Sequence, residues 1–365
     1  MKPVRILVIS NFSGPENSVR PEAEIFLKLA QSEDFEITVM TPTGGVYPKK
    51  ALNQGLKVID YRPQSKFDPR AISLIRKYVR ENAVDVVQAF NSKAIANAAW
   101  ALMGLPAKLV GYRGYTGNIR WYDPTCYIDF LNPRVDRMIC LAESVRTMMM
   151  ANGMSASRAI TIHKGHDPRW YENITAASLD EFRIPQNTLT AAFVANKRWH
   201  MKGLDLLVEA LSKLDDHQIC VLMIGSNLDD PHINRLIEKH GVEDKIRIKG
   251  FREDVHSIVK ACDFAISSSR YGEAIQKAII EASFLGLPTL ITDISGNRGM
   301  VIHQKTGYVA AANSANSLAS GLSYMYQNKQ RLKQMGDLAR EHITSFLSHE
   351  QTVEKYAALY KSLVR

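Results

Sequence analysis

The feature that most constrains the fold is an alternation of short β-branched runs with helical patterns along almost the whole chain. The run "VRILVIS" is followed by the helical pattern "PEAEIFLKLAQ" and then by "FEITVMT", and runs such as "DVVQAF" and "KLVGYR" recur with helices between them. Strands and helices that alternate in this way form a parallel sheet covered by helices on both faces. The chain is therefore predicted to have an α/β fold.

The alternation of strand and helix patterns is interrupted once, and this interruption predicts two domains. Between about residues 166 and 188 the sequence has little periodicity, and the rhythm restarts at "TLTAAFVAN". A chain of 365 residues also exceeds what one hydrophobic core usually supports. We expect one doubly wound domain over residues 1–165 and another over residues 166–347, with a helix at about 348–365 that packs back on the first.

The composition excludes several classes of protein. No stretch reaches the eighteen apolar residues of a membrane span, and the N-terminal apolar run is too short for a secretion signal. The four cysteines are far apart, without the spacing of a zinc site or a disulfide framework. We therefore expect a reduced, cytoplasmic protein that needs no metal.

The positive charge is concentrated in the first half of the chain. Residues 1–165 hold 22 Lys and Arg against 14 Asp and Glu, whereas residues 166–365 hold 24 against 23. This asymmetry is typical of a domain that meets an anionic partner, such as a membrane surface, a phosphorylated glycan or nucleic acid. A basic, solvated surface without a partner explains it equally well.

Ligands of open parallel sheets bind beyond the carboxyl ends of the strands, so the candidate residues follow strands. After the first strand, Gly14 precedes a helix expected to open near Pro21, and amides there could approach a phosphate. After the strand "TLTAAFVAN", three cations precede a helix that starts at Gly203 and could clamp a diphosphate: Lys197, Arg198 and Lys202.

The third such turn is "SSSRYGEAIQKAIIEAS", in which a helix is expected from about Ala274 to Leu285. Glu273 stands at its start, where capping explains it as well as ligand binding does. Glu281 lies two turns deeper among apolar residues, and a carboxylate is costly to bury without a partner. It is predicted to hold a ligand, with a buried pair to Lys or Arg as the structural alternative.

Five segments resemble the retaining glycosyltransferases of the GT-B fold, in particular glycosyltransferase family 4. The matching segments are "LAESVRTMMMANGM", "ITIHKGHD", "ANKRWHMKGLDLL", "GEAIQKAIIEASFLGLPTLITD" and "KTGYVA". The resemblance implies two Rossmann-like domains that face an interdomain cleft. The first would bind the acceptor and the second a nucleotide-sugar donor.

The resemblance also implies roles for the candidate residues. Glu273 would contact the donor sugar and Glu281 the ribose hydroxyls, while Lys202, with Arg198 or Lys197, would neutralise the leaving diphosphate. Residues at the start of the helix would approach the same donor: Ala274, Ile275, Gln276 and Lys277.

The chain departs from the family pattern at several of these positions. Ala274, Ile275 and Gln276 stand where the family often has Gly-Phe-Gly, and Lys164 replaces an Asn. Arg113 stands near the position of a family His and could brace the reacting centre as a catalytic residue.

The function implied is metal-independent hexosyl transfer, with retention of configuration, in cell-surface polysaccharide or lipopolysaccharide biosynthesis. The donor expected is a UDP-sugar, with a GDP-sugar as the alternative, and the acceptor is a saccharide or glycolipid. No cofactor and no nucleic acid are expected, and the inner face of the plasma membrane is a further expected partner. A nucleotide-sugar epimerase of the same fold and a non-catalytic nucleotide-sugar or glycan binding module remain as alternatives.

Overall fold

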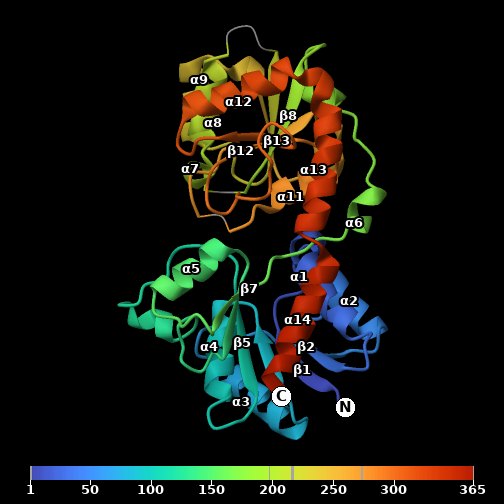
Figure 1. The fold of residues 1–365 in the computed structure, drawn as a ribbon, viewed down its shortest axis with the longest axis vertical. Helices are drawn as coiled ribbons and strands as arrows, with labels where there is room; N and C mark the ends of the chain where they lie inside the picture. Colours follow the sequence, from blue (N-terminus) through green and yellow to red (C-terminus); the bar gives the residue numbers. More distant parts are fainter. Residues whose placement is uncertain (1, 197, 215–217, 273, 365) are drawn as a thin grey trace. The chain divides into compact units, whose positions relative to one another are not determined.

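The computed structural model describes residues 2–196, 198–214, 218–272 and 274–364. The chain divides into two compact units, which we call the first unit (Met1–His166 with Leu347–Arg365) and the second unit (Asp167–Phe346). Each unit is built on one parallel sheet with helices on both faces (Figure 1). The predicted α/β fold with two doubly wound domains is therefore confirmed.

The first unit has the strand order β3-β2-β1-β4-β5-β6-β7. Helices α1, α2 and α14 lie together on one face, and α3 and α4 pack against each other on the opposite face (Figure 1). The strands are β1 Val4–Ile9, β2 Phe35–Met40, β3 Lys57–Ile59, β4 Val86–Ala89, β5 Lys108–Arg113, β6 Arg137–Cys140 and β7 Ala159–Thr161. The helices are α1 Glu16–Leu29, α2 Val46–Asn53, α3 Pro69–Glu81, α4 Ser92–Ala101, α5 Glu143–Ala151 and α14 His349–Val364.

The second unit has the strand order β10-β9-β8-β11-β12-β13. Helices α8, α9 and α12 cover one face, and α11 packs with α10 and α13 on the other (Figure 1). The strands are β8 Leu189–Val194, β9 Ile219–Ile224, β10 Ile246–Lys249, β11 Phe264–Ser267, β12 Thr289–Thr292 and β13 Gly307–Ala310. The helices are α6 Arg169–Glu172, α7 Trp199–Lys202, α8 Leu204–Ser212, α9 Pro231–His240, α10 Val255–Ala261, α11 Lys277–Phe284, α12 Ala315–Gln327 and α13 Leu332–Phe346.

Helix α14 belongs to the first unit although it comes last in the chain. The amide of His166 donates to the carbonyl of Leu347 (2.8 Å), and the amide of His349 donates back to the carbonyl of His166 (3.1 Å). Deeper in the unit, the hydroxyl of Tyr360 donates to Oε1 of Gln88 on β4 (2.9 Å), and both side chains are buried. These bonds fasten α14 to the sheet.

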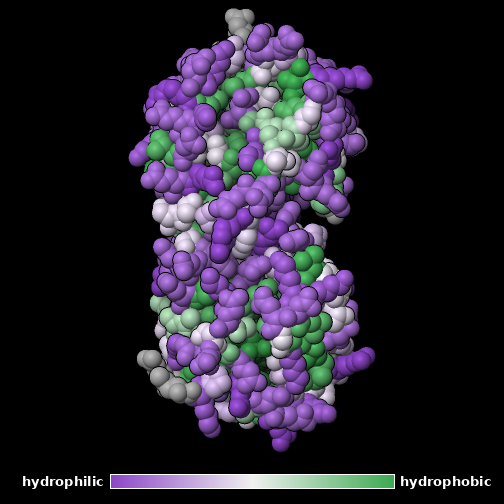
Figure 2. All heavy atoms as spheres, turned by 90° about the vertical axis from the view of Figure 1, so that its right-hand side faces the viewer, coloured by the Kyte–Doolittle hydropathy of each residue, from purple (hydrophilic) through white to green (hydrophobic). Residues whose placement is uncertain are grey.

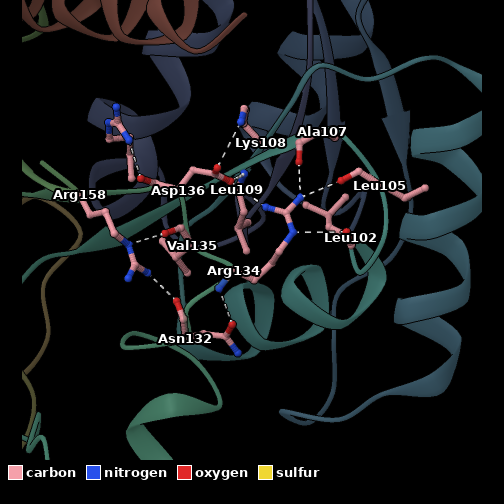
Figure 3. Close-up of polar contacts among 11 residues, drawn as sticks. Leu102, Leu105, Ala107, Lys108, Leu109, Asn132, Arg134, Val135, Asp136 and Arg158 are labelled. Atoms are coloured by element: carbon pink, nitrogen blue, oxygen red, sulfur yellow. Dashed lines mark hydrogen bonds and ion pairs between the residues drawn. The ribbon is translucent and has the colours of Figure 1, made fainter. Parts of the chain in front are cut away.

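Two arginines organise the amino-terminal edge of the first sheet (Figure 3). The guanidinium of Arg134 donates to three backbone carbonyls and to one carboxylate, those of Leu102, Leu105, Ala107 and Asp136. Arg158 donates in the same way to the carbonyls of Asn132 and Val135. Because this edge is opposite the carboxyl ends of the strands, we assign the network to stability rather than to ligand binding.

The surface drawn in Figure 2 is mostly hydrophilic, and hydrophobic residues gather there only in small separate patches. No helix within the described ranges is both long and apolar enough to cross a membrane.

Replacing Arg134 tests the network. We expect Arg134→Ala to lower the free energy of unfolding by roughly 2–4 kcal/mol, because several partly buried carbonyls lose their donor. The matched control is Lys77→Ala, whose exposed ammonium lies 4.0 Å from Glu81, and whose loss should cost under about 0.5 kcal/mol. Equal costs in urea titrations of the two variants would contradict the assignment.

Candidate functional site

The candidate site lies where the strand order of the second sheet reverses. Strands β8 and β11 are neighbours, and the chain leaves them toward opposite sides of the sheet. Doubly wound folds bind ligands at this switch point, beyond the carboxyl ends of the two strands. The described residues that form it are 195–196 and 198–203 after β8 and 268–272 and 274–276 after β11.

The two segments are locked together by a close backbone approach. Gly203 has φ +65°, and a Cβ atom at this position would lie 2.1 Å from the carbonyl oxygen of Ser268. The hydroxyl of Ser268 donates to the carbonyls of Lys202 and Gly203 at 2.9 Å each. The amide of Arg270 donates to the carbonyl of Met201 (2.9 Å). Helix α7 is thus held at a fixed place beside the end of β11.

The side chain of Arg270 also links the turn after β11 to the start of α8. Its guanidinium pairs with Asp205 of α8 and donates to Oδ1 of Asn313 (3.0 Å). The sequence analysis did not single out Arg270, Asp205 or Ser268. The run of three serines directly after β11 was the only local signal, because small hydroxyl residues permit such a close approach.

Glu281 is buried on α11, and the structure supplies the partner that its burial requires. The ammonium of Lys277, one turn earlier, contacts Oε1, and Nε2 of His256 lies 2.9 Å from the same oxygen. Burial raises the pKa of the Glu281 carboxyl, but the hydrogen bonds and charges of His256 and Lys277 outweigh it and lower the pKa to about 2. A buried pair with Lys was the alternative noted from the sequence, and His256 was not anticipated.

The predicted diphosphate cations lie on the first of the two segments. Arg198 is exposed in a left-handed conformation (φ +54°), and Lys202 is half-buried at the end of α7. Lys197 and Glu273 fall outside the described residues, so their predicted roles stay predictions. In the described part of the chain, no cluster of His, Cys, Asp and Glu side chains could hold a metal ion.

Helix α11 begins later than predicted. It starts at Lys277, not at Ala274, so Ala274, Ile275 and Gln276 form the approach to the helix. Gln276 occupies the N-cap in an extended conformation, and its side chain makes no capping bond. Its buried Nε2 has no hydrogen-bond partner among the described residues. Lys277 and Ala278 therefore provide the first helical amides, which lack an intrahelical acceptor.

The turn at Gly14 in the first unit also differs from the prediction. Helix α1 begins at Glu16, and Pro21 lies inside it instead of opening it. Glu16 places a carboxylate in the first turn, where it pairs with Arg20 (2.9 Å). A negative side chain therefore lies in the first turn of α1, and the phosphate contact predicted at Gly14 stays a prediction.

Arg113 is a buried residue at the carboxyl end of β5. Its guanidinium donates to the carbonyls of Tyr115 and Gly117 and lies 4.4 Å from the centre of the Phe130 ring. Burial lowers the pKa of this guanidinium. These contacts anchor the loop after β5, and the catalytic role predicted for Arg113 stays a prediction.

A mostly buried ion pair of the first unit was also not predicted. The ammonium of Lys164, which replaces the Asn of the family pattern, pairs with Glu22 of α1. The hydroxyl of Tyr112 donates to the same Oε1 of Glu22 (2.9 Å), and burial raises the pKa of Tyr112. Lys164 is therefore engaged within the first unit.

Comparison with known families agrees with this geometry. The family described as Glycosyltransferase Family 4 matches residues 25–170, and the family described as Glycosyl transferases group 1 matches residues 176–342. The chain belongs to the family 4 glycosyltransferases. The predicted resemblance is thereby confirmed.

Three known proteins illustrate how this glycosyltransferase relates to others. It is 22% identical over 207 residues to N-acetyl-alpha-D-glucosaminyl L-malate synthase of Bacillus anthracis, an alignment that covers 56% of this chain and 54% of that one. It is 28% identical over 120 residues to UDP-Gal:alpha-D-GlcNAc-diphosphoundecaprenol alpha-1,3-galactosyltransferase of Escherichia coli, covering 33% and 30%. The chain spans about half the length of the first curated relatives it matches.

The third comparison is structural. HepE of Anabaena, solved in complex with UDP, has a TM-score of 0.76 at 17% identity, covering 99% of this chain and 100% of that one. This similarity confirms the GT-B fold of the glycosyltransferase.

The lock at Gly203 is tested by adding one methyl group. Gly203→Ala should lower the free energy of unfolding by more than about 2 kcal/mol, since the new Cβ meets the Ser268 carbonyl. Gly241→Ala is the matched control, because Gly241 has φ +61° at the end of α9 but open space around its Cβ; its cost should be near 1 kcal/mol. Similar unfolding midpoints for both variants would rule out the lock.

The ionised state of Glu281 predicts a loss of stability in acid. Because its folded pKa lies below the ordinary value of 4.5, the stabilisation is complete above pH 4.5 and is lost as the pH falls toward 2. The shift corresponds to roughly 3 kcal/mol. Denaturant titrations at pH 5 and pH 2.5 should show that the free energy of unfolding falls more for the wild type than for Glu281→Gln. An equal fall in both proteins would refute the ionised pair.

Proposed function

We propose that this glycosyltransferase moves a hexosyl group from a UDP-sugar to a saccharide or glycolipid acceptor in cell-surface glycan biosynthesis, with retention of configuration. Two features of the second unit support the proposal: the cationic turn after β8, which is held against the end of β11, and the ionised, buried carboxylate of Glu281 on α11, the helix that follows β11. The first suits a diphosphate, and the second suits the hydroxyls of a nucleotide sugar.

The donor proposal is supported by the relatives. HepE is solved with UDP, and the name of the Escherichia coli relative includes UDP-Gal. In the second unit of this chain, Lys202 and Arg198 would neutralise the diphosphate while Glu281 accepts from the ribose. A GDP-sugar is the alternative donor, because the contacts proposed for Lys202, Arg198 and Glu281 are to the diphosphate and the ribose and do not involve the base.

In the proposed reaction the bond between C1 of the sugar and the diphosphate oxygen breaks, and a bond from C1 to the acceptor oxygen forms on the same face. In this step the acceptor hydroxyl passes its proton to the departing diphosphate oxygen, which leaves on the same face. No enzyme nucleophile takes part, so the residues contribute by stabilising the leaving diphosphate and by fixing the donor. Glu273, outside the described residues, is proposed to contact the donor sugar.

The acceptor proposal rests on charge. The first 165 residues carry the excess of Lys and Arg, which suits an anionic acceptor. The names of both relatives include such a group, malate in one and a diphosphate-linked lipid in the other. We also propose that the same basic excess supports contact with an anionic membrane surface.

Membership of family 4 favours transfer over the epimerase and binding-module alternatives, and one assay separates the three. The chain is incubated with a panel of nucleotide sugars, with and without saccharide and glycolipid acceptors. Free nucleotide that appears only with an acceptor supports transfer. An isomerised donor would indicate an epimerase, and binding without turnover would indicate a binding module.

In this assay Lys202→Met should lower kcat/KM by about 100-fold or more, because the leaving diphosphate loses a cation in the transition state. Lys213→Met provides the matched control, since Lys213 is an exposed residue after α8 that pairs only loosely with Glu209 (3.4 Å); its kcat/KM should stay within about twofold. Equal rates for the two variants would argue against the proposed diphosphate site.

A further inference from the structure

The two carboxylate oxygens of Glu281 are in different situations. Both described contacts, from Nζ of Lys277 and from Nε2 of His256, are made to Oε1. The side chain is 12% exposed, so it keeps a small opening to solvent. Oε1 is therefore held by two side chains, whereas no contact from the described residues is made to Oε2.

His256 is itself held in a defined orientation. It comes from α10, its side chain is mostly buried, and its ring meets the ring of Tyr171 edge to face at 5.8 Å. Tyr171 in turn stacks on Phe284 of α11 at 5.2 Å. Nε2 of His256 has no hydrogen-bond partner with good geometry among the described residues, and the polar atom that lies 2.9 Å from it is Oε1 of Glu281.

Lys277 holds the same oxygen from within α11. It is the first residue of the helix, one turn before Glu281, and its side chain is 34% exposed. The ammonium of Lys277 on α11 and the imidazole of His256 on α10 therefore hold the carboxylate from two helices. Without them, burial alone would favour the protonated carboxyl, which is a weaker acceptor.

We propose that His256 and Lys277 are positioning residues that direct Oε2 of Glu281 to the ribose, and that they thereby set a preference for ribonucleotide over 2′-deoxyribonucleotide donors. This inference rests on the proposed function, because it takes the nucleotide of the donor as the ligand. The chemistry is that of one ionised oxygen accepting from the vicinal hydroxyls of a ribose. A 2′-deoxyribose lacks one of those hydroxyls and leaves part of the acceptor unsatisfied.

The test is a ratio of affinities measured by calorimetry on the full chain. UDP and GDP are each compared with their 2′-deoxy counterparts. The wild type should bind the ribonucleotide at least about 10-fold more tightly, as expected for a hydrogen bond to a charged group. His256→Ala and Lys277→Met should each reduce this ratio to about threefold or less, while His256→Gln and Lys277→Arg should restore most of it.

A matched control separates this effect from a general loss of charge. Lys213→Met removes an ammonium from another Lys–Glu pair with four-residue spacing in the same unit, and its ratio should equal that of the wild type. Thermal unfolding of each variant shows that it is folded. Because the Lys277 side chain is more exposed (34%) than that of His256 (14%), Lys277→Met is the safer variant if His256→Ala fails to fold.

The outcomes also separate this inference from the proposed function. If the variants bind nucleotide with an unchanged ratio, the positioning role is overturned and the proposed transferase function stands. If the wild type binds neither UDP nor GDP, the proposed function is overturned together with the inference. A reduced ratio that the conservative variants restore supports both.

Discussion

The candidate site of the second unit depends on the close approach of Gly203 to the carbonyl of Ser268. Only a residue without a side chain can take this position, because φ is positive and no space exists for a Cβ. The approach joins the turn after β8 to the turn after β11, and Arg270 with Asp205 holds the same two segments from the other side. Strands that are separate in sequence thus present one continuous surface at the switch point.

A second constraint is the buried carboxylate of Glu281. Burial of an ion is tolerated only when its charge is compensated, and here a lysine and an imidazole compensate it. The same contacts keep the Glu281 carboxylate ionised at neutral pH. The ion pair that stabilises the fold therefore also maintains a strong hydrogen-bond acceptor.

Much of this fold could be predicted from sequence, because strand and helix periodicities are local. Two helix starts were misplaced: Pro21 suggested a start that Glu16 provides, and α11 begins at Lys277. Strand β3 was not predicted; it is three residues long and none of its residues is fully buried, so its hydrophobic signal is weak. His256 could not be predicted as the partner of Glu281, because the packing of α10 on α11 brings them together and no sequence spacing encodes it.

The most direct test of the account is a crystal structure of the chain with UDP bound. The account predicts that a ribose hydroxyl lies within hydrogen-bond distance of Glu281 Oε2, while Lys277 and His256 keep their contacts to Oε1. It also predicts that the diphosphate lies beside the turn that contains Arg198 and Lys202. UDP bound away from this switch point, with no contact to Glu281, would contradict the account.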